Sequence, residues 1–280
     1  MKKILLMLLC LTTFIIAGCG DKFAKEKEAI TKAEQAAMAM KLPVVERPDF
    51  SKMPKPTNEE RQKIWKKYNE DFGKLVETEE KILEEMRKSD VQIAEMEKKA
   101  ESDSEKKDLK AFKDKIQQAR IEFVKKVSKG RLFGDTFIVG VGSTWQEIEM
   151  VYGQPKTKKS DYDYEYEGLA FRDWYSKGVP PKGYKFVSNG PQSVMVTSKK
   201  YLSDAGVKIG MTKDEFYKAL KSKYVKKDKY QKEVLSVGHG TTYKETFDGV
   251  MGYSMQDTKP YNLFCFFEND KLVRYTVAPY

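Results

Sequence analysis

Hydrophobic residues recur every three or four positions through much of the first half of the chain, which is the spacing of an amphipathic helix. This pattern predicts helices over about residues 58–101 and 104–129. The first helix has an apolar face of Tyr68, Phe72, Leu75, Ile82, Met86, Ile93, Met96 and Ala100, with Glu79 and Ser89 in the same register. The second has Leu109, Phe112, Ile116, Ala119, Phe123 and Val127. Each helix should therefore bury one face against a neighbour.

A shorter helix is predicted over about residues 23–41, where alanines alternate with Ile30 and Met40. Four prolines between residues 42 and 56 then predict an extended linker, because proline lacks the amide donor that a helix needs. Thr57 and Glu60 have the spacing of a capping box. The middle helix would be about 66 Å long, close to the combined length of its two neighbours. We expect the two shorter helices to pack antiparallel to it, end to end; the alternative is a two-helix hairpin after a flexible spacer.

The pattern changes from Gly130 onward to short runs of alternating or continuous apolar residues separated by turn residues. Strands are predicted at residues 137–139, 194–196, 262–267 and 271–277, with Glu268-Asn269-Asp270 as a hairpin turn. The expected fold class is α+β. An antiparallel, coiled-coil-like helical region comes first, and a duplicated helix-plus-antiparallel-sheet domain follows it.

The duplication is expected from a seven-residue motif. Gly142-Ser143-Thr144-Trp145-Gln146-Glu147-Ile148 recurs 68 positions later as Gly210-Met211-Thr212-Lys213-Asp214-Glu215-Phe216. Both copies present a glycine turn, a threonine N-cap and a glutamate three residues on, so each predicts a capped helix. The first helix should stop at Tyr152-Gly153-Gln154-Pro155. The two repeats would span about residues 138–204 and 205–280.

Both motifs, and the strand sequence Tyr164-Glu165-Tyr166-Glu167-Gly168-Leu169-Ala170-Phe171, resemble a group of small α+β modules. These modules are similar to β-lactamase-inhibitor protein and to the small outer-membrane assembly lipoproteins of the SmpA/OmlA type. The resemblance covers residues 138–280. It implies a non-enzymatic domain that binds other proteins or supports the cell envelope.

The first twenty residues read as a secretory leader. Lys2 and Lys3 precede an apolar run from Ile4 to Ile16 that is too short to span a bilayer. The sequence Ile16-Ala17-Gly18-Cys19 resembles the lipobox of bacterial lipoproteins, which implies that Cys19 becomes the first mature residue and carries diacylglycerol. The alternative is an ordinary secretory signal that contains a cysteine. The lipobox predicts an extracytoplasmic protein anchored to the cell membrane or, in a two-membrane bacterium, to the outer membrane.

The expected domains follow from these boundaries. They are a signal peptide over residues 1–18, a lipid-anchored short helix with the proline-rich linker over 19–56, a helical hairpin over 57–129 and the tandem α+β domain over 130–280.

Net charge and cysteine content add two constraints. The chain carries +10, and removal of Lys2 and Lys3 with the leader leaves +8, which favours anionic membrane surfaces or wall polymers. Nucleic acid is not an expected partner, because no reading motif is present. Cys265 alone would remain as a thiol, so no intrachain disulfide is expected, and its apolar surroundings predict a buried, inert side chain.

Three groups of residues are candidates for contact with a partner. Tyr162, Tyr164 and Tyr166 alternate with acids on a predicted strand and belong either to the core or to a recognition surface. Trp174 and Tyr175 flank a turn-rich loop and serve either as contact residues or as core. A basic cluster is either solvated surface or a contact for anionic lipid or an acidic partner; it contains Lys221, Lys223, Lys226, Lys227 and Lys229.

Sequence motifs for catalysis are lacking. His239 is the only histidine, which argues against a multi-histidine metal site, and no nucleophile-elbow or phosphate-binding glycine motif occurs. We therefore expect no enzyme, cofactor or metal. The predicted function is that of a membrane-anchored lipoprotein that binds another envelope protein. The alternative is a structural scaffold that works through self-association of residues 57–129.

Overall fold

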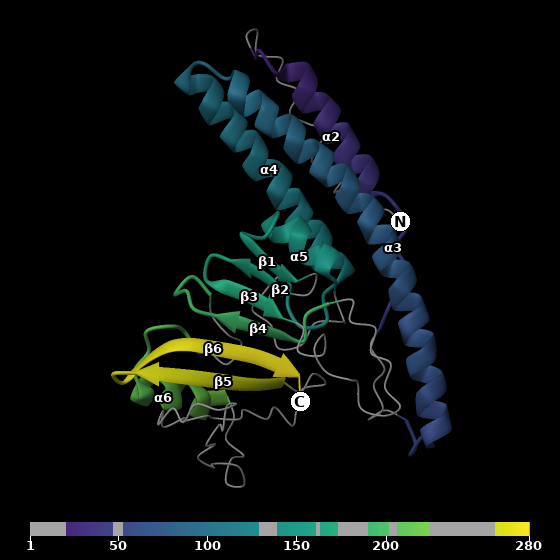
Figure 1. The fold of residues 1–280 in the computed structure, drawn as a ribbon, viewed down its shortest axis with the longest axis vertical. Helices are drawn as coiled ribbons and strands as arrows, with labels where there is room; N and C mark the ends of the chain where they lie inside the picture. Colours follow the sequence, from purple (N-terminus) through teal and green to yellow (C-terminus); the bar gives the residue numbers. More distant parts are fainter. Residues whose placement is uncertain are drawn as a thin grey trace. The chain divides into compact units, whose positions relative to one another are not determined.

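The computed structural model describes residues 21–46, 53–128, 139–160, 163–172, 190–201, 206–223 and 261–279 (Figure 1). It is a mixed structure of helices and one antiparallel sheet, which confirms the α+β class. The described residues divide into two compact units. One contains those of Met1–Leu42 and Glu77–Phe123, and the other those of Pro43–Val76 and Val124–Tyr280.

Three helices dominate the first half of the chain, close to the predicted bounds: α2 (Ala24–Met38), α3 (Asn58–Lys99) and α4 (Asp103–Val127). The capping box at α3 is confirmed, because the Thr57 amide donates to Glu60 at 2.8 Å and the Glu60 amide donates to the Thr57 hydroxyl at 3.2 Å. Ser102 and Glu105 form the same arrangement before α4. Both helices therefore begin where a side chain satisfies the free amides of the first turn.

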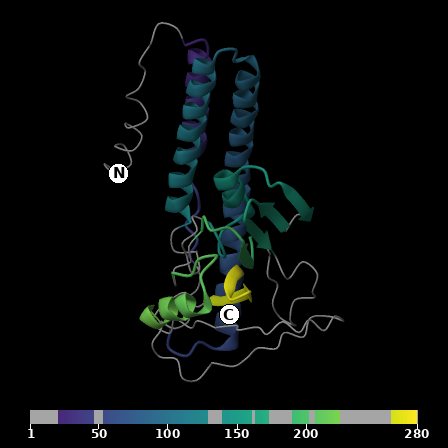
Figure 2. The same ribbon diagram turned by 90° about the vertical axis from the view of Figure 1, so that its left-hand side faces the viewer.

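These helices pack as a three-helix bundle rather than end to end (Figure 2). One apolar cluster takes residues from all three: Ile30 of α2 with Phe23 just before it, Ile93 and Met96 of α3 with Ala100 just after it, and Leu109 and Ile116 of α4. Hence α2 and α4 lie beside the same half of α3, and both the end-to-end arrangement and the flexible spacer are wrong. The physical reason is that α2 has an apolar face of its own to bury.

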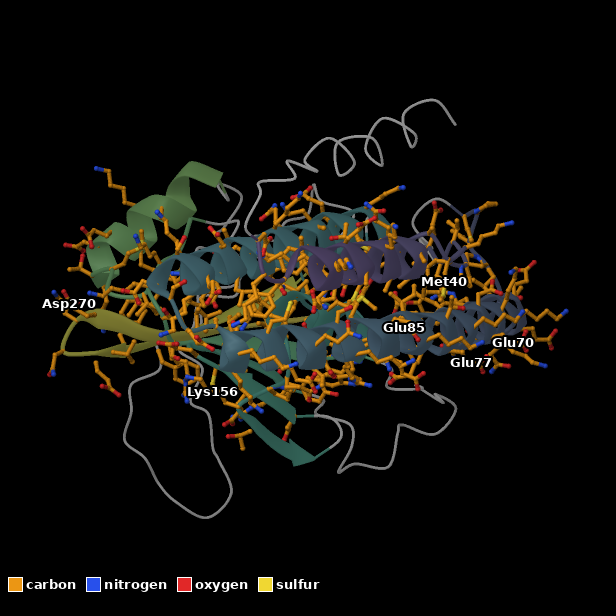
Figure 3. The ribbon with its side chains drawn as sticks, turned by 90° about the horizontal axis from the view of Figure 1, so that it is seen from above. Met40, Glu70, Glu77, Glu85, Lys156 and Asp270 are labelled. Atoms are coloured by element: carbon orange, nitrogen blue, oxygen red, sulfur yellow. The ribbon has the colours of Figure 1, made fainter. Side chains whose placement is uncertain are left out.

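The predicted apolar face of α3 is confirmed, including its two polar members. Glu79 and Ser89 are 0% and 2% exposed, in line with Ile82, Met86 and Ile93. Glu70 and Glu77 extend outward from α3, as Figure 3 shows. On α4 the buried line departs from the prediction after Ile116. It continues through Arg120, Val124 and Ser128 instead of Ala119, Phe123 and Val127.

The second half of the chain forms a six-stranded antiparallel sheet in the order β1-β2-β3-β4-β6-β5. Its strands are β1 (Thr157–Ser160), β2 (Asp163–Tyr166), β3 (Leu169–Arg172), β4 (Ser193–Val196), β5 (Tyr261–Glu268) and β6 (Lys271–Pro279). Three of the four predicted strands are confirmed. Of the fourth, residues 137 and 138 lie outside the described residues and Val139 sits in a bend.

The predicted turn between β5 and β6 is confirmed. Asn269 and Asp270 have φ of 50° and 61°, the left-handed conformation that a two-residue hairpin turn requires. Asp270 lies at the tip of this hairpin (Figure 3).

Two short helices cover one face of the sheet. The ring of Trp145, in α5 (Trp145–Tyr152), lies 4.7 Å from that of Tyr164, and Phe216, in α6 (Lys213–Lys223), lies 5.3 Å from Phe267. We call this the helix-covered face. Paired residues of neighbouring strands project to the same side of a sheet. This face therefore also carries the buried residues Leu169, Phe171, Val194, Val196, Cys265, Tyr275 and Val277.

The opposite side, which we call the second face, carries a different set of residues. By the same pairing it holds Glu165, Ala170, Arg172, Ser193, Met195, Phe266, Arg274 and Thr276. Ala170 and Ser193 are buried, and the others are half-buried.

The two motifs form the same local structure. Gly142 and Gly210 have φ of 99° and 91°, a backbone conformation that residues other than glycine rarely adopt. The Ser143 amide donates to the Gly140 carbonyl at 3.0 Å, and 68 positions later the Met211 amide donates to the Lys208 carbonyl at 3.2 Å. Buried residues match as well, in the pairs Val139 and Val207, Val141 and Ile209, and Ile148 and Phe216.

Candidate functional site

Most of the predicted contact residues lie outside the described residues. These are Cys19, Tyr162, Trp174, Tyr175, Lys226, Lys227 and Lys229. Lys221 and Lys223 lie in the last turn of α6, but their side chains are also outside what the structure describes. The described part of the site thus reduces to Tyr164 and Tyr166 and to surfaces that the sequence did not single out.

The two tyrosines pack against α5. Tyr164 is 7% exposed and its ring lies against that of Trp145 at a tilt of 47°, so it belongs to the core. Tyr166 is half-buried between Tyr152 and Phe171, with ring centroids 5.2 and 5.9 Å away. Its hydroxyl donates to the Gly153 carbonyl at 2.9 Å. Of the two alternatives for this strand, the structure therefore places Tyr164 in the core, whereas Tyr166 is half-buried beside α5.

Burial shifts the ionisation of this aromatic group. It raises the pKa of Tyr166 above its ordinary value, and the nearby Glu149 carboxylate adds to the shift. Burial raises the pKa of Tyr152 as well, with a smaller contribution from Tyr201. Both phenols therefore stay neutral over the physiological range.

Cys265 is buried as predicted. Its side chain is 1% exposed and lies beside Tyr275 of the paired strand. Burial raises the pKa of the thiol, so the reactive thiolate is strongly disfavoured. A chemically inert core residue is the result.

The second face holds a pair of residues that sequence reasoning missed. The Arg274 guanidinium stacks over the Phe266 ring at 3.7 Å from its centroid. Among the described residues no carboxylate lies within salt-bridge distance of Arg274, and its Nε makes no hydrogen bond. Arg172 on the same face has a partner, because it lies 3.5 Å from Glu165. Both Phe266 and Arg274 were in predicted strands, but only the strand register shows that they are neighbours.

A buried ionic cluster joins the three long helices. The Arg120 guanidinium donates to Glu34 at 2.5 and 3.1 Å, and its Nη2 also donates to the Met86 carbonyl at 2.9 Å. It lies 2.9 Å from Asp90 as well. The Arg120 and Glu34 side chains are 4% and 1% exposed, whereas that of Asp90 is 51% exposed. Burial raises the pKa of Asp90, although the Arg120 charge opposes the shift. The cluster is structural, because the Arg120 guanidinium of α4 binds groups of both α2 and α3.

Within the described ranges, no group of three or more histidine, cysteine or carboxylate side chains is placed to hold a metal ion. None of the helices in that part of the chain is both long enough and apolar enough to cross a membrane. Comparison with protein-family models, curated proteins and solved structures finds no match for this chain. The resemblance noted above therefore rests on the quoted residues alone.

Proposed function

We propose that the protein is a membrane-anchored extracytoplasmic lipoprotein whose α+β domain binds another envelope protein without catalysing a reaction. The anchor is Cys19, in the lipobox-like sequence Ile16-Ala17-Gly18-Cys19. Diacylglycerol on this residue, together with a further acyl chain, gives stable membrane attachment, because each buried CH₂ contributes about 0.8 kcal/mol.

The observation that carries the binding role is the correspondence between the two turn-and-helix motifs. They share a glycine of positive φ, a threonine–glutamate capping box and the same buried positions. In addition β4 and β6, which follow the two motifs, pair with each other in the sheet. This supports a tandem module of the kind that the sequence resembles, and such modules bind proteins.

A contact surface that fits this role is the second face around Arg274. Arginine, phenylalanine and methionine are enriched at protein interfaces, and Arg274 and Phe266 lie on the same face as Met195. The planar guanidinium is held by the ring and has no carboxylate partner in the described part of the chain. A carboxylate of the partner would complete it. Trp174 and Tyr175, which lie outside the described residues, remain proposed contacts on the sequence alone.

The alternative of a self-associating scaffold has less support. The apolar residues of α3 and α4 that would form a helical seam between molecules, such as Ile93 and Leu109, are already buried against Phe23 and Ile30 of the same chain.

The experiment is photo-crosslinking in intact cells from Thr197, which is exposed. It follows Val196, the partner of Tyr275, and so lies beside Arg274. We expect one dominant adduct with an envelope protein, reduced at least tenfold by Arg274→Gln, since loss of a charge-assisted contact costs about 1.5–3 kcal/mol. Arg172→Gln is the matched control and should leave the adduct unchanged. Absence of any adduct from Thr197 and from Tyr175 would reject the binding role.

A further inference from the structure

The beginning of α2 is fixed at one end of the bundle. Phe23 is 4% exposed in the apolar cluster with Ala100. The Phe23 amide donates to the Asp21 carboxylate at 2.9 Å, and Lys27 donates to the same carboxylate at 3.0 Å. Lys22 donates to the Lys99 carbonyl at 2.9 Å. The packed bundle therefore begins at residue 21, and no flexible segment separates Asp21 from α2.

The turn between α3 and α4 lies at the same end. Lys22 is 3.6 Å from Glu101 and 4.0 Å from Glu105, so the start of α2, the end of α3 and the start of α4 are neighbours. Figures 1 and 2 both show this end of the bundle, with α2 beginning beside the connection from α3 to α4. We call these residues, 21–23 and 99–105, the turn end.

Very little chain separates the turn end from Cys19. Residues of a fully extended chain span at most about 3.6 Å each, so Cys19 lies within about 7 Å of Asp21. The proline-rich segment over residues 42–56 comes after α2, so it gives no reach between the lipid and the bundle. The flexible spacer that was the alternative for the first part of the mature chain therefore does not separate the lipid from the bundle.

We infer that the turn end lies against the lipid surface, held there by the acylated Cys19. This inference rests on the proposed lipid anchor. The surface that the turn end contacts is the bilayer headgroup region. Exposed lysines lie in or directly beside the turn end: Lys98, Lys99, Lys106 and Lys107. The acids Asp21, Glu101, Asp103 and Glu105 share this end, so the short covalent reach, and not net charge, sets the contact.

The opposite end of α4 gives a matched reference position. Lys125 is exposed and lies 22 residues after Asp103 along one helix, which corresponds to about 33 Å. A bundle that stands with its turn end on the membrane keeps Lys125 away from the headgroups. A bundle on a long flexible tether would expose both positions to lipid equally.

The experiment uses the full mature protein, acylated in cells and transferred to vesicles of phosphatidylcholine and phosphatidylglycerol that contain lipid with a nitroxide on its headgroup. A fluorophore is attached to Asp103→Cys or to Lys125→Cys. We expect the nitroxide to quench the label at position 103 and to leave the label at position 125 unquenched. Equal quenching at the two positions, or quenching at 125 alone, would overturn the inference.

Two variants separate this inference from the proposed anchor. Inserting a flexible glycine–serine segment of about 20 residues between Gly20 and Asp21 keeps the lipid but removes the short reach. Quenching at position 103 should then be lost, and its persistence would overturn the inference. Cys19→Ala should abolish palmitate labelling, with Cys10→Ala as the control that keeps it. Equal labelling of wild type and Cys19→Ala would reject the anchor itself, and the inference with it.

Discussion

At the scale of single residues, Arg120 decides how the helices of the bundle are arranged. Its position breaks the apolar line on α4, and an isolated buried guanidinium would be costly. Glu34 from α2 and the Met86 carbonyl from α3 satisfy it, and both lie in the same bundle. A buried pair of this kind adds little net stability over apolar residues, but each partner makes the other necessary.

Removing one member of this pair should destabilise the protein strongly. Arg120→Met leaves the Glu34 carboxylate buried without its cation, and we expect the free energy of unfolding to fall by about 3–5 kcal/mol. Lys113→Met is the control, because it removes an exposed ion pair with Glu97 and should cost less than about 1 kcal/mol. Urea unfolding followed by circular dichroism measures both.

The double variant Glu34→Leu with Arg120→Met tests the same reasoning in reverse. It replaces two charges with apolar side chains of similar size, so it should recover most of the stability that Arg120→Met loses. A double variant as unstable as the sum of the two single ones would show that the ionic contact itself stabilises the bundle.

At the scale of elements, the two turn-and-helix motifs share hydrogen bonds but differ in burial. Thr144 and Glu147 are each 0% exposed, whereas Thr212 is half-buried and Glu215 is exposed. Gly190 lies against the first motif: a Cβ at this position would stand 1.8 Å from the Ser143 carbonyl oxygen, so only glycine fits there. The first motif is thus the more tightly enclosed of the two.

This difference predicts unequal costs for the same substitution. Thr144→Ala should lower the free energy of unfolding by about 2 kcal/mol, because it leaves a buried amide without an acceptor. Thr212→Ala should cost about 0.5–1 kcal/mol, because water can replace the lost hydroxyl. Equal losses in thermal unfolding of the two variants would contradict this assignment.

The elements themselves were largely predictable from sequence, whereas their neighbours were not. The bounds of α3, expected at about 58–101 and found at 58–99, follow from local periodicity and from the Thr57 cap. The contact between Arg274 and Phe266 depends on strand register across a bulge at Phe266/Phe267, which local patterns do not encode. Likewise the position of α2 beside α4 depends on Arg120. Its burial could not be predicted from local sequence, because arginine is rarely buried unless it is paired.

At the scale of the whole molecule, the sheet domain keeps several ionisable groups neutral. Burial raises the pKa of Tyr152, Tyr166, Tyr275 and Cys265, all of which lie in or against the helix-covered face. The folded state therefore retains protons that the unfolded chain releases above about pH 8.5 for the thiol and about pH 10 for the phenols.

This proton retention predicts a loss of stability in alkali. Because the folded state then binds more protons than the unfolded state, the free energy of unfolding decreases as the pH rises through this range. The melting temperature should fall as the pH rises from about 8 to 11. The melting temperature of Tyr152→Phe should fall less steeply, because this variant lacks one of the ionisable groups. A melting temperature independent of pH over this range would contradict the burial of these side chains.

The buried position of Cys265 has a practical consequence for the study of this protein. With Cys10 in the predicted leader and Cys19 proposed to carry lipid, the native fold offers no thiol to a labelling reagent in the described residues. Any cysteine placed on the surface therefore reports from one known position without removal of the natural one. The protein is in this respect ready for site-specific spectroscopy on intact membranes, where background labelling usually limits the measurement.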